Sequence, residues 1–252
     1  MSGTFVMMMA AGARVEQPIE GQTGVWLKSG TTVISSAMTM TGVVISSGQT
    51  QYIYDRGKSL DCIFRAGAVQ IVYSGGFDSG TSDYWGNGAS AYISSGGTSF
   101  DRYAGGYLRV SSGAYLSSAY THGGILYNAG TVVSTVKTTG ATTFNTFGGG
   151  FSYDLYVSSG VNCAVADGRL IGVSGLPATN ATFKASNGGV ILNAVFESGW
   201  VITIGSRGGL VSGATLKSGC TMTISSGGSA LAVTSNAGAV VTVQAGGYIE
   251  YA

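Results

Sequence analysis

The sequence is poor in proline, histidine and charged residues. Of its 252 residues, 2 are proline, 1 is histidine and 9% are charged, with 12 basic and 11 acidic side chains. Nucleic-acid binding needs a clustered basic face, and because the charges form no run of either sign we expect no nucleic-acid partner. A single histidine and three scattered cysteines match no spacing typical of transition-metal sites, so we expect no metal and no cofactor.

Long hydrophobic runs are also missing. No apolar stretch approaches the roughly 20 residues that cross a bilayer as a helix, so we expect no membrane span in this chain. Residues 4–13 resemble the core of a short signal peptide but have no basic residues in front of them. We therefore expect residues 1–24 to form an N-terminal cap or a leader-like segment, and residues 25–252 to form a single repeat domain.

Glycine and apolar residues are abundant, with 43 glycines and 44% hydrophobic residues. Glycine does not occupy every third position, which excludes collagen, and the low charge with ample apolar surface disfavours disorder. Short apolar segments alternate with period two, as in Val241-Thr242-Val243, and end in Ser-Gly or Gly-Gly. A period of two excludes a helical solenoid and predicts many short strands joined by tight turns.

These turns recur with a period of about nineteen residues. Gly-Gly pairs begin at Gly208, Gly227 and Gly246, and a second turn recurs at Gly219 and Gly238. Strands closed in this way can coil into a solenoid in which each strand pairs in parallel with its equivalent about 4.8 Å away. We predict an all-β, single-stranded, right-handed parallel β-helix (β-solenoid) with rungs of roughly 19 residues, about thirteen at most. Gly227 is expected to need a positive φ.

The alternation of V-x-S-G-G and V-x-x-G-G turns at this period resembles the passenger repeats of AIDA-type autotransporter adhesins. The resemblance covers most of residues 25–247 and is best over residues 200–247. It implies a non-enzymatic, surface-exposed β-helix outside a bacterial cell, which mediates adherence or self-aggregation. Its implied partners are a glycan or protein on a host or neighbouring cell, or a second copy of itself.

The same resemblance implies O-heptosylation of repeat serines by a dedicated glycosyltransferase. The candidate acceptors are the serines of the Ser-Ser-Gly turns, namely Ser46, Ser47, Ser94, Ser95, Ser111, Ser112, Ser158, Ser159, Ser225 and Ser226. The sequence does not decide which serine of each pair faces outward.

Twelve of the fourteen tyrosines lie between residues 52 and 156. Tyr54, Tyr73 and Tyr92 follow each other at intervals of nineteen residues, and Tyr84 precedes Tyr103 by the same interval. Side chains stacked one rung apart form ladders, and an exposed tyrosine ladder is a platform for sugar rings or for a protein partner. The alternative is that these rings only stabilise the stack.

Parallel β-helices also include polysaccharide lyases and hydrolases, which makes an enzyme the competing hypothesis. Glycosidic cleavage needs two facing carboxylates about 5–10 Å apart. The best candidates are Asp83 and Asp101, which are almost one repeat apart in the sequence, with Arg102 and Tyr103 following. Isolated surface carboxylates are the simpler interpretation, and we expect no catalytic residues. A self-assembling structural subunit is a third hypothesis.

The remaining reactive side chains favour structural roles. His122 is expected at a turn one rung above Tyr103. Cys62, Cys163 and Cys220 are expected to be free, buried thiols, with the last two on one face and three rungs apart, too far for a disulfide.

Overall fold

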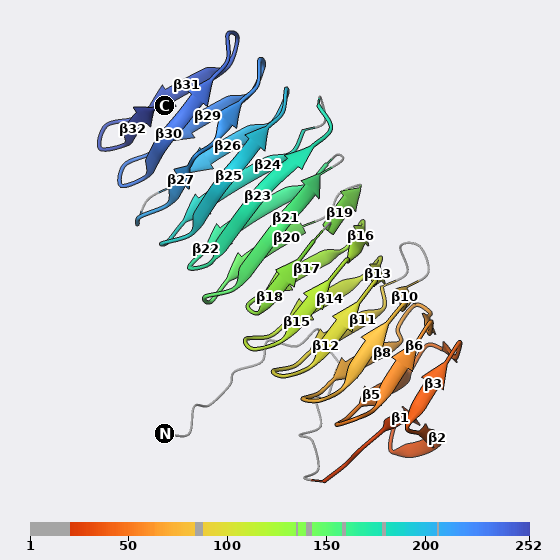
Figure 1. Ribbon diagram of the computed structural model, residues 1–252. Coiled ribbons are helices and arrows are strands. Elements are labelled where there is room, and N and C mark those ends of the chain that lie inside the picture. The colour runs from red at the N-terminus through yellow and green to blue at the C-terminus, as the bar shows by residue number, and fades with distance from the viewer. Residues whose placement is uncertain are drawn as a thin grey trace.

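A computed structural model describes the backbone of residues 136–139 and, in full, residues 21–83, 88–134, 143–157, 160–177, 180–205 and 207–252. Within these ranges the regular structure consists of 32 strands and no helix. The strands stack one above another into a single rod (Figure 1). Consequently, no described segment is a helix long and apolar enough to cross a membrane.

Each rung of the rod contributes strands to three faces. The first face is a sheet of 13 strands, namely β1 (Val25–Ser29), β2 (Thr32–Ala37), β5 (Gln49–Ile53), β8 (Val69–Val72), β11 (Ser90–Ile93), β14 (Tyr107–Val110), β17 (Ile125–Asn128), β20 (Thr143–Phe147), β22 (Asn162–Ala166), β24 (Thr182–Ser186), β26 (Val201–Ile204), β29 (Thr221–Ile224) and β31 (Val240–Val243).

The other two faces share one continuous network of pairings. The second face holds β3 (Thr39–Thr41), β6 (Lys58–Leu60), β9 (Phe77–Ser79), β12 (Thr98–Phe100), β15 (Tyr115–Ser117), β18 (Thr131–Val133), β27 (Leu210–Ser212) and β32 (Tyr248–Tyr251). The third face holds β4 (Val44–Ile45), β7 (Ile63–Phe64), β10 (Ser82–Asp83), β13 (Tyr103–Ala104), β16 (Tyr120–His122), β19 (Val136–Thr139) and β28 (Thr215–Leu216). Four longer strands bend across both faces: β21 (Phe151–Val157), β23 (Arg169–Gly175), β25 (Val190–Phe196) and β30 (Ser229–Ser235).

A left-handed residue marks the corner between the second and third faces in eleven successive rungs. We call these residues the corner column: Gly42, Asp61, Gly80, Asp101, Ser118, Ser134, Asp154, Gly172, Asn193, Gly213 and Ala232. Glycine adopts a positive φ without steric cost, and aspartate and asparagine tolerate it better than most residues. Because the same bend recurs at the same place, each rung lies directly on the one before it.

The N-terminal end of the stack is closed by an antiparallel hairpin. Strand β1 runs antiparallel to β5, with Trp26 opposite Tyr52, and β2 runs antiparallel to β1. Parallel stacking therefore begins at β3, and the first face contains eleven parallel strands instead of the thirteen rungs that the chain length allows. Residues 1–20 lie outside the described residues, so the N-terminal cap or leader stays a prediction.

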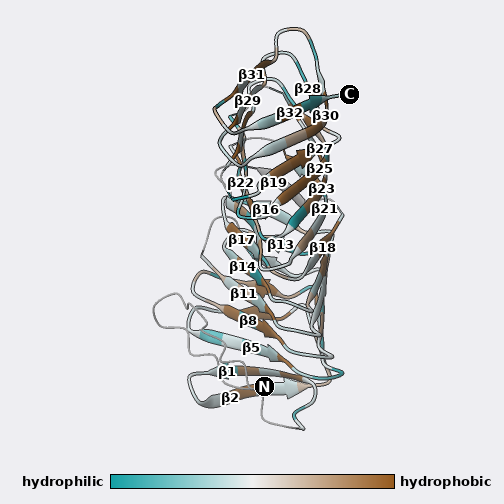
Figure 2. Ribbon diagram, turned by 90° about the vertical axis from the view of Figure 1, so that its left-hand side faces the viewer, coloured by the Kyte–Doolittle hydropathy of each residue, from teal (hydrophilic) through white to brown (hydrophobic). Residues whose placement is uncertain are grey.

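Alternate residues of each strand point inward and form one continuous apolar core. Ile53, Val72 and Ile93 are paired in successive rungs, and each is fully buried. Apolar strands occur throughout the rod (Figure 2). The largest core side chain, Trp200, fits because Gly175 lacks a Cβ, which would lie 2.9 Å from its ring. The predicted single-stranded parallel β-helix with rungs of roughly nineteen residues is confirmed.

The rungs differ in length. The step from Val72 to Ile93 is longer than the average repeat and the step from Ile93 to Val110 is shorter, yet both pairs are neighbours in the first face. The turns absorb the difference, so a strict nineteen-residue alignment slips in this part of the rod.

Because the rungs differ in length, the predicted stacking is wrong for two residues. Tyr92 is paired with Ile71 rather than standing above Tyr73. Likewise Tyr120, not His122, lies on Tyr103.

Candidate functional site

Three of the five tyrosines considered for an exposed platform are buried. Tyr54, Tyr73 and Tyr92 have exposed fractions of 3%, 6% and 5%. The rings of Tyr54 and Tyr73 are stacked with centroids 5.0 Å apart, and Tyr52 extends the stack at 6.1 Å from Tyr54. With Ile71 they form a second hydrophobic cluster, separate from the core. Tyr54 and Tyr73 stack on each other and Tyr92 packs against Tyr107, so these three rings are not an exposed platform and agree with the alternative, that they stabilise the stack.

Tyr103 lies instead on the outer surface of the third face, where it is half-buried. Its ring stacks on that of Tyr120, with centroids 4.6 Å apart and planes inclined by 22°. Burial is the main cause that raises the pKa of Tyr103, and the neighbouring Tyr120 raises it further. Along the same face, Tyr120 is paired with Lys137 and Lys137 with Tyr156. We call Tyr103, Tyr120 and Tyr156 the outer tyrosine column. Tyr84 lies outside the described residues.

The two carboxylates proposed for glycosidic cleavage do not face each other. Asp83 is 1% exposed and points into the core, whereas Asp101 is an exposed member of the corner column. A corner residue and a strand residue leave the rung in different directions, which spacing along the sequence does not reveal. The predicted pair Asp83 and Asp101 therefore offers no catalytic geometry.

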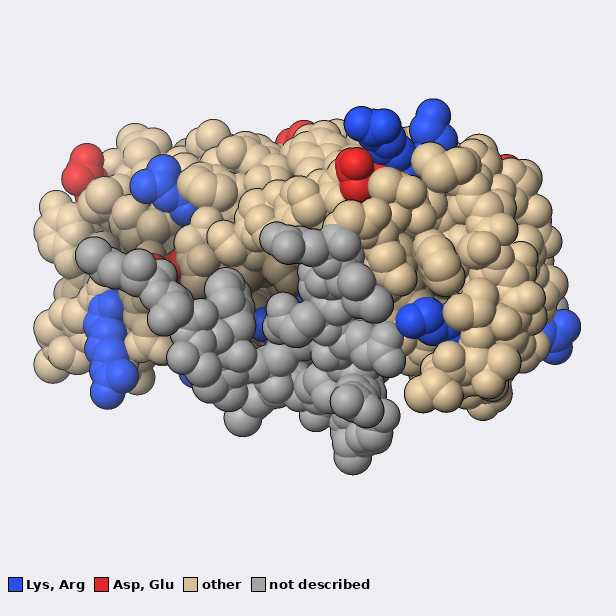
Figure 3. Space-filling view, turned by 90° about the horizontal axis from the view of Figure 1, so that it is seen from below, with Lys and Arg blue, Asp and Glu red and all other residues tan. Residues whose placement is uncertain are grey.

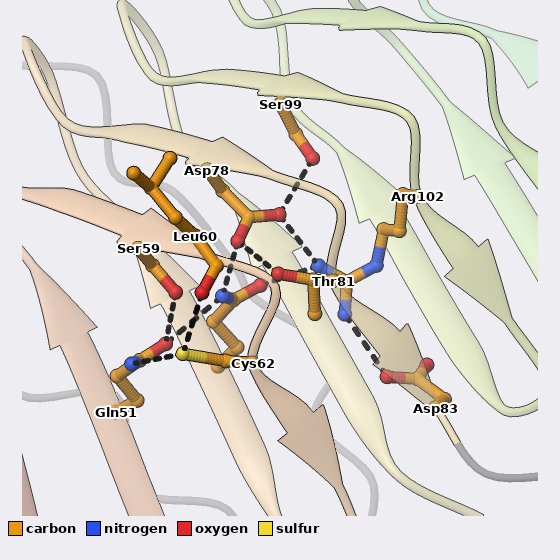
Figure 4. Close-up of polar contacts among 10 residues, drawn as sticks. Gln51, Ser59, Leu60, Cys62, Asp78, Thr81, Asp83, Ser99 and Arg102 are labelled. Atoms are coloured by element: carbon orange, nitrogen blue, oxygen red, sulfur yellow. Dashed lines mark hydrogen bonds and ion pairs between the residues drawn. The ribbon is translucent and has the colours of Figure 1, made fainter. Parts of the chain in front are cut away.

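Asp83 instead belongs to a polar cluster inside the β-helix, centred on Arg102 (Figure 4). The Arg102 side chain is fully buried; its Nη1 lies 3.2 Å from Oδ2 of Asp78, and its Nη2 lies 3.2 Å from Oδ1 of Asp83. Nη1 also donates to Oε1 of Gln70. Since Asp78, Asp83 and Arg102 are at most 1% exposed, no polysaccharide reaches these groups.

The two aspartates, Asp78 and Asp83, differ in their hydrogen-bond partners. Asp78 accepts hydrogen bonds from Gln70 Nε2 at 2.8 Å, from Ser99 Oγ at 2.9 Å and from the hydroxyl of Thr81. Asp83 Oδ2 has no hydrogen-bond partner among the described residues, nor has Nε of Arg102. Desolvation by burial raises the pKa of Asp83, and the charge of Arg102 opposes that rise.

Sequence reasoning missed most of this cluster, although a signal was present. Gln51 and Gln70 are nineteen residues apart, as are Ser59 and Asp78, and each pair stacks in adjacent rungs. Gln70 Nε2 and Ser59 Oγ both donate to Gln51 Oε1 at 3.0 Å. Polar side chains repeated at the rung period indicate a polar layer, but their inward direction is fixed only by the register.

The serine-glycine turns show which serine of each pair faces outward. Ser47, Ser95, Ser112 and Ser226, the second serines, are exposed, whereas the first serines Ser94, Ser111 and Ser225 are half-buried and only Ser46 is also exposed. Ser158 and Ser159 lie outside the described residues.

Three of these second serines lie against a glycine of the next rung. A Cβ added to Gly67, Gly113 or Gly246 would lie 2.8, 2.6 or 2.7 Å from the Oγ of Ser47, Ser95 or Ser226 respectively. The same arrangement occurs at two exposed single serines that sequence reasoning passed over, Ser74 below Gly96 and Ser218 below Gly238. Each of these turn glycines has a positive φ, which favours glycine, and its lack of a Cβ leaves room for the serine hydroxyl of the rung beneath.

The cysteines are free and buried, as predicted. Burial raises the pKa of Cys220 to about 12 and also raises that of Cys163. The two do not share a column: Cys163 is paired with Phe183, whereas Cys220 follows the turn level with Trp200. The described part of the chain contains no group of three His, Cys, Asp or Glu side chains able to hold a metal ion.

No family model matches the sequence, and no curated protein matches it. Among solved structures, the chain is similar to the TibC-catalysed hyper-glycosylated fragment of TibA. The two are 23% identical and superpose with a TM-score of 0.45, over 84% of this chain and 91% of that chain. The function of the present chain is therefore inferred from its own surfaces.

Proposed function

We propose that the chain is a non-enzymatic adhesive or self-associating module displayed at a bacterial cell surface, in line with its AIDA-type repeats. The supporting observation is that the paired carboxylates and guanidinium lie in the interior and not on the outer surface. The carboxylates and guanidinium of Asp78, Asp83 and Arg102 are sealed in the core. On the face shown in Figure 3, most of the surface of the described residues belongs to side chains other than Lys, Arg, Asp and Glu.

Repetition supplies the binding mechanism. Outward hydroxyl and aromatic side chains recur at the rung spacing of about 4.8 Å. One such contact is weak, but a rigid rod brings many of them to the same partner, and their free energies add through multivalency. The partner is a glycan or protein on a host or neighbouring cell, or a second copy of the chain.

The exposed serines of the turns are the proposed attachment points for glycans added by a dedicated glycosyltransferase. They form two rows along the turns: Ser74, Ser95, Ser112 and Ser226 after the first face, and Ser47 and Ser218 after the third. Above each of them except Ser112, the next rung carries a glycine, so no side chain covers the serine Oγ from above. Bulky sugars on these rows would extend sideways from the rod without disturbing the core.

Surface display in a non-adherent bacterial host tests the adhesive function. Cells that display the chain should sediment or adhere faster than cells with an empty display vector. Displaying cells that stay dispersed and bind neither each other nor host cells would overturn the proposal. Release of new reducing ends from a polysaccharide panel by the purified chain would contradict its non-enzymatic part.

Mass spectrometry of the chain co-expressed with a glycosyltransferase tests the acceptor assignment. We expect sugars on Ser95, Ser112 and Ser226. The first serines Ser94 and Ser111 serve as matched controls, since each stands one position away in the same turn. Sugars confined to the first serines would refute the assignment without touching the adhesive function.

A further inference from the structure

A groove of about 400 Å³ lies on the outside of the rod, along the corner between the second and third faces. It crosses four adjacent rungs, from Ser134 after β18 to the long strands β21, β23 and β25. Its lining residues are Ser134, Asp154, Tyr156, Gly172, Val173, Ser174, Asn193 and Val195. Four of these belong to the corner column, and Tyr156 ends the outer tyrosine column.

The groove exists because glycine alternates with longer side chains in the corner column. Asp154, Gly172 and Asn193 occupy one corner position in three successive rungs. A Cβ on Gly172 would lie 2.8 Å from Oδ1 of Asp154. In the notch left by the missing side chain, the exposed carboxylate of Asp154 therefore lies over Gly172, and the exposed Asn193 occupies the next corner position, one rung spacing of about 4.8 Å beyond Gly172.

One wall of the notch is formed by the adjoining strand residues. Tyr156 is paired with Ser174, and Val173 is paired with Ala194, which places Val195 on the far side of Ser174. Tyr156 and Val195 are half-buried and Ser174 is exposed. The wall thus offers an aromatic ring, a hydroxyl and a small apolar surface in series along the rod.

This combination of groups matches a sugar ring. A carboxylate accepts hydrogen bonds from neighbouring hydroxyls, an amide both donates and accepts, and serine hydroxyls do either. An aromatic ring supplies an apolar surface with a polar tip, which suits the C–H face of a pyranose. Asp154 forms no ion pair among the described residues, so its negative charge disfavours an anionic ligand.

A peptide fits the groove less well. Peptides commonly bind sheets by adding a strand to a free edge. Strands β21, β23 and β25 are hydrogen-bonded to one another, and β23 has partners on both sides, so no edge is available here.

We propose that this groove binds one or two rings of a neutral glycan, with Asp154 and Asn193 as the hydrogen-bonding groups and Tyr156 as the stacking platform. The proposal rests on the adhesive function and names its ligand class and site. Tyr103 and Tyr120, whose rings are stacked, lie in the same column of the third face, but the position of Lys137 separates them from Tyr156.

The test uses an array of neutral and sialylated glycans, followed by calorimetric titration of the strongest ligand. Asp154→Asn and Tyr156→Ala should each lower affinity at least tenfold. Asp154→Asn keeps a residue that tolerates the positive φ. The matched controls are Asp101→Asn, elsewhere in the corner column, and Tyr153→Ala, in the same strand but outside the groove; both should bind within twofold of the wild type.

NMR titration of the wild-type chain with the same glycan gives a readout that does not depend on variant folding. The amides of Asp154, Gly172 and Asn193 should shift most. No glycan binding, a preference for sialylated glycans, or shifts located elsewhere would overturn the groove proposal.

Adhesion assays distinguish a failure of the groove proposal from a failure of the adhesive function. If cells displaying Asp154→Asn and Tyr156→Ala adhere as well as wild type, the adhesive function stands and the groove proposal fails. If cells displaying the wild-type chain do not adhere, the adhesive function itself fails.

Discussion

Asp78 and Arg102 form an ion pair inside the β-helix, with Oδ2 and Nη1 3.2 Å apart and both side chains fully buried. Burying two charges carries a large desolvation cost, which close geometry and further hydrogen bonds offset. Arg102 also reaches Asp83 and Gln70, so one guanidinium joins several strands of neighbouring rungs. This cluster lies where a long rung is followed by a short one, and it ties these irregular rungs to one register.

Arg102→Leu should lower the free energy of unfolding by about 3–5 kcal/mol, because Asp78 and Asp83 then remain in the core without a countercharge. Urea denaturation followed by circular dichroism measures the change. Arg109→Leu, on the outside of the first face, is the matched control and should cost less than ~1 kcal/mol. Equal losses in both variants would show that the buried pair has no special role.

Asp83→Asn should change how stability depends on pH. Since burial raises the pKa of Asp83, the folded chain holds this proton more tightly than the unfolded chain. Its contribution is therefore complete below the ordinary pKa of 3.8 and is lost as the pH rises through the raised value. Asparagine imitates the protonated acid, so the variant should lose this slope and be at least as stable as wild type at pH 7. Asp167→Asn, at an exposed position, should keep the wild-type slope.

Substitutions in the corner column should have opposite effects at two neighbouring rungs. Ala232 has φ 49° and Gly213 has φ 64°. The left-handed region costs a residue with a Cβ about 1–2 kcal/mol. Gly213→Ala should therefore destabilise by about that amount, whereas Ala232→Gly should stabilise by up to ~1 kcal/mol. Thermal unfolding of both variants measures these changes in stability. A stabilising Gly213→Ala would contradict the left-handed corner assigned to this position.

Tyr73→Ser should destabilise the chain by about 3 kcal/mol, because it removes a buried ring from the stack with Tyr54. Tyr156→Ser, in the outer tyrosine column, should cost less than ~1 kcal/mol. Chemical denaturation of the two variants compares a structural ring with a displayed one. If Tyr73→Ser left the unfolding curve unchanged, the buried stack would not stabilise the rod.

The three thiols should be unreactive in the folded chain. Cys62, Cys163 and Cys220 are buried, and the pKa of Cys220 is raised to about 12, so the nucleophilic thiolate is scarce at pH 8. Incubation with iodoacetamide followed by mass measurement should find no adduct within minutes, and three adducts in urea. Rapid labelling of the native chain would place a thiol at the surface.

The sequence predicted the repeat correctly because turns need glycine and strands need alternation wherever they lie. Gly227, expected to need a positive φ, has φ 76°. Register was harder to predict, since a slightly longer or shorter turn leaves each strand pattern intact while changing its partners. Tyr92 was therefore aligned with Tyr73 although it pairs with Ile71.

The candidate site was predicted only in outline. The outer position of Tyr103 follows from alternation, but its partner Tyr120 lies in a rung shorter than the average repeat, so a fixed period misses it. The groove depends on Gly172 standing between Asp154 and Asn193. That relation appears only once three rungs are stacked, because the two steps between these residues are unequal in the sequence.

The stacking of rungs along one axis also determines how the rod responds to a mechanical load. The hydrogen bonds between rungs point along the axis, so a pull on the two ends peels one terminal rung at a time. Each detached rung exchanges about 4.8 Å of rod for roughly 65 Å of extended chain, at ~3.4 Å per residue. Such a rod lengthens in small steps under tension instead of breaking at once, and the remaining rungs provide the template on which the released chain rewinds.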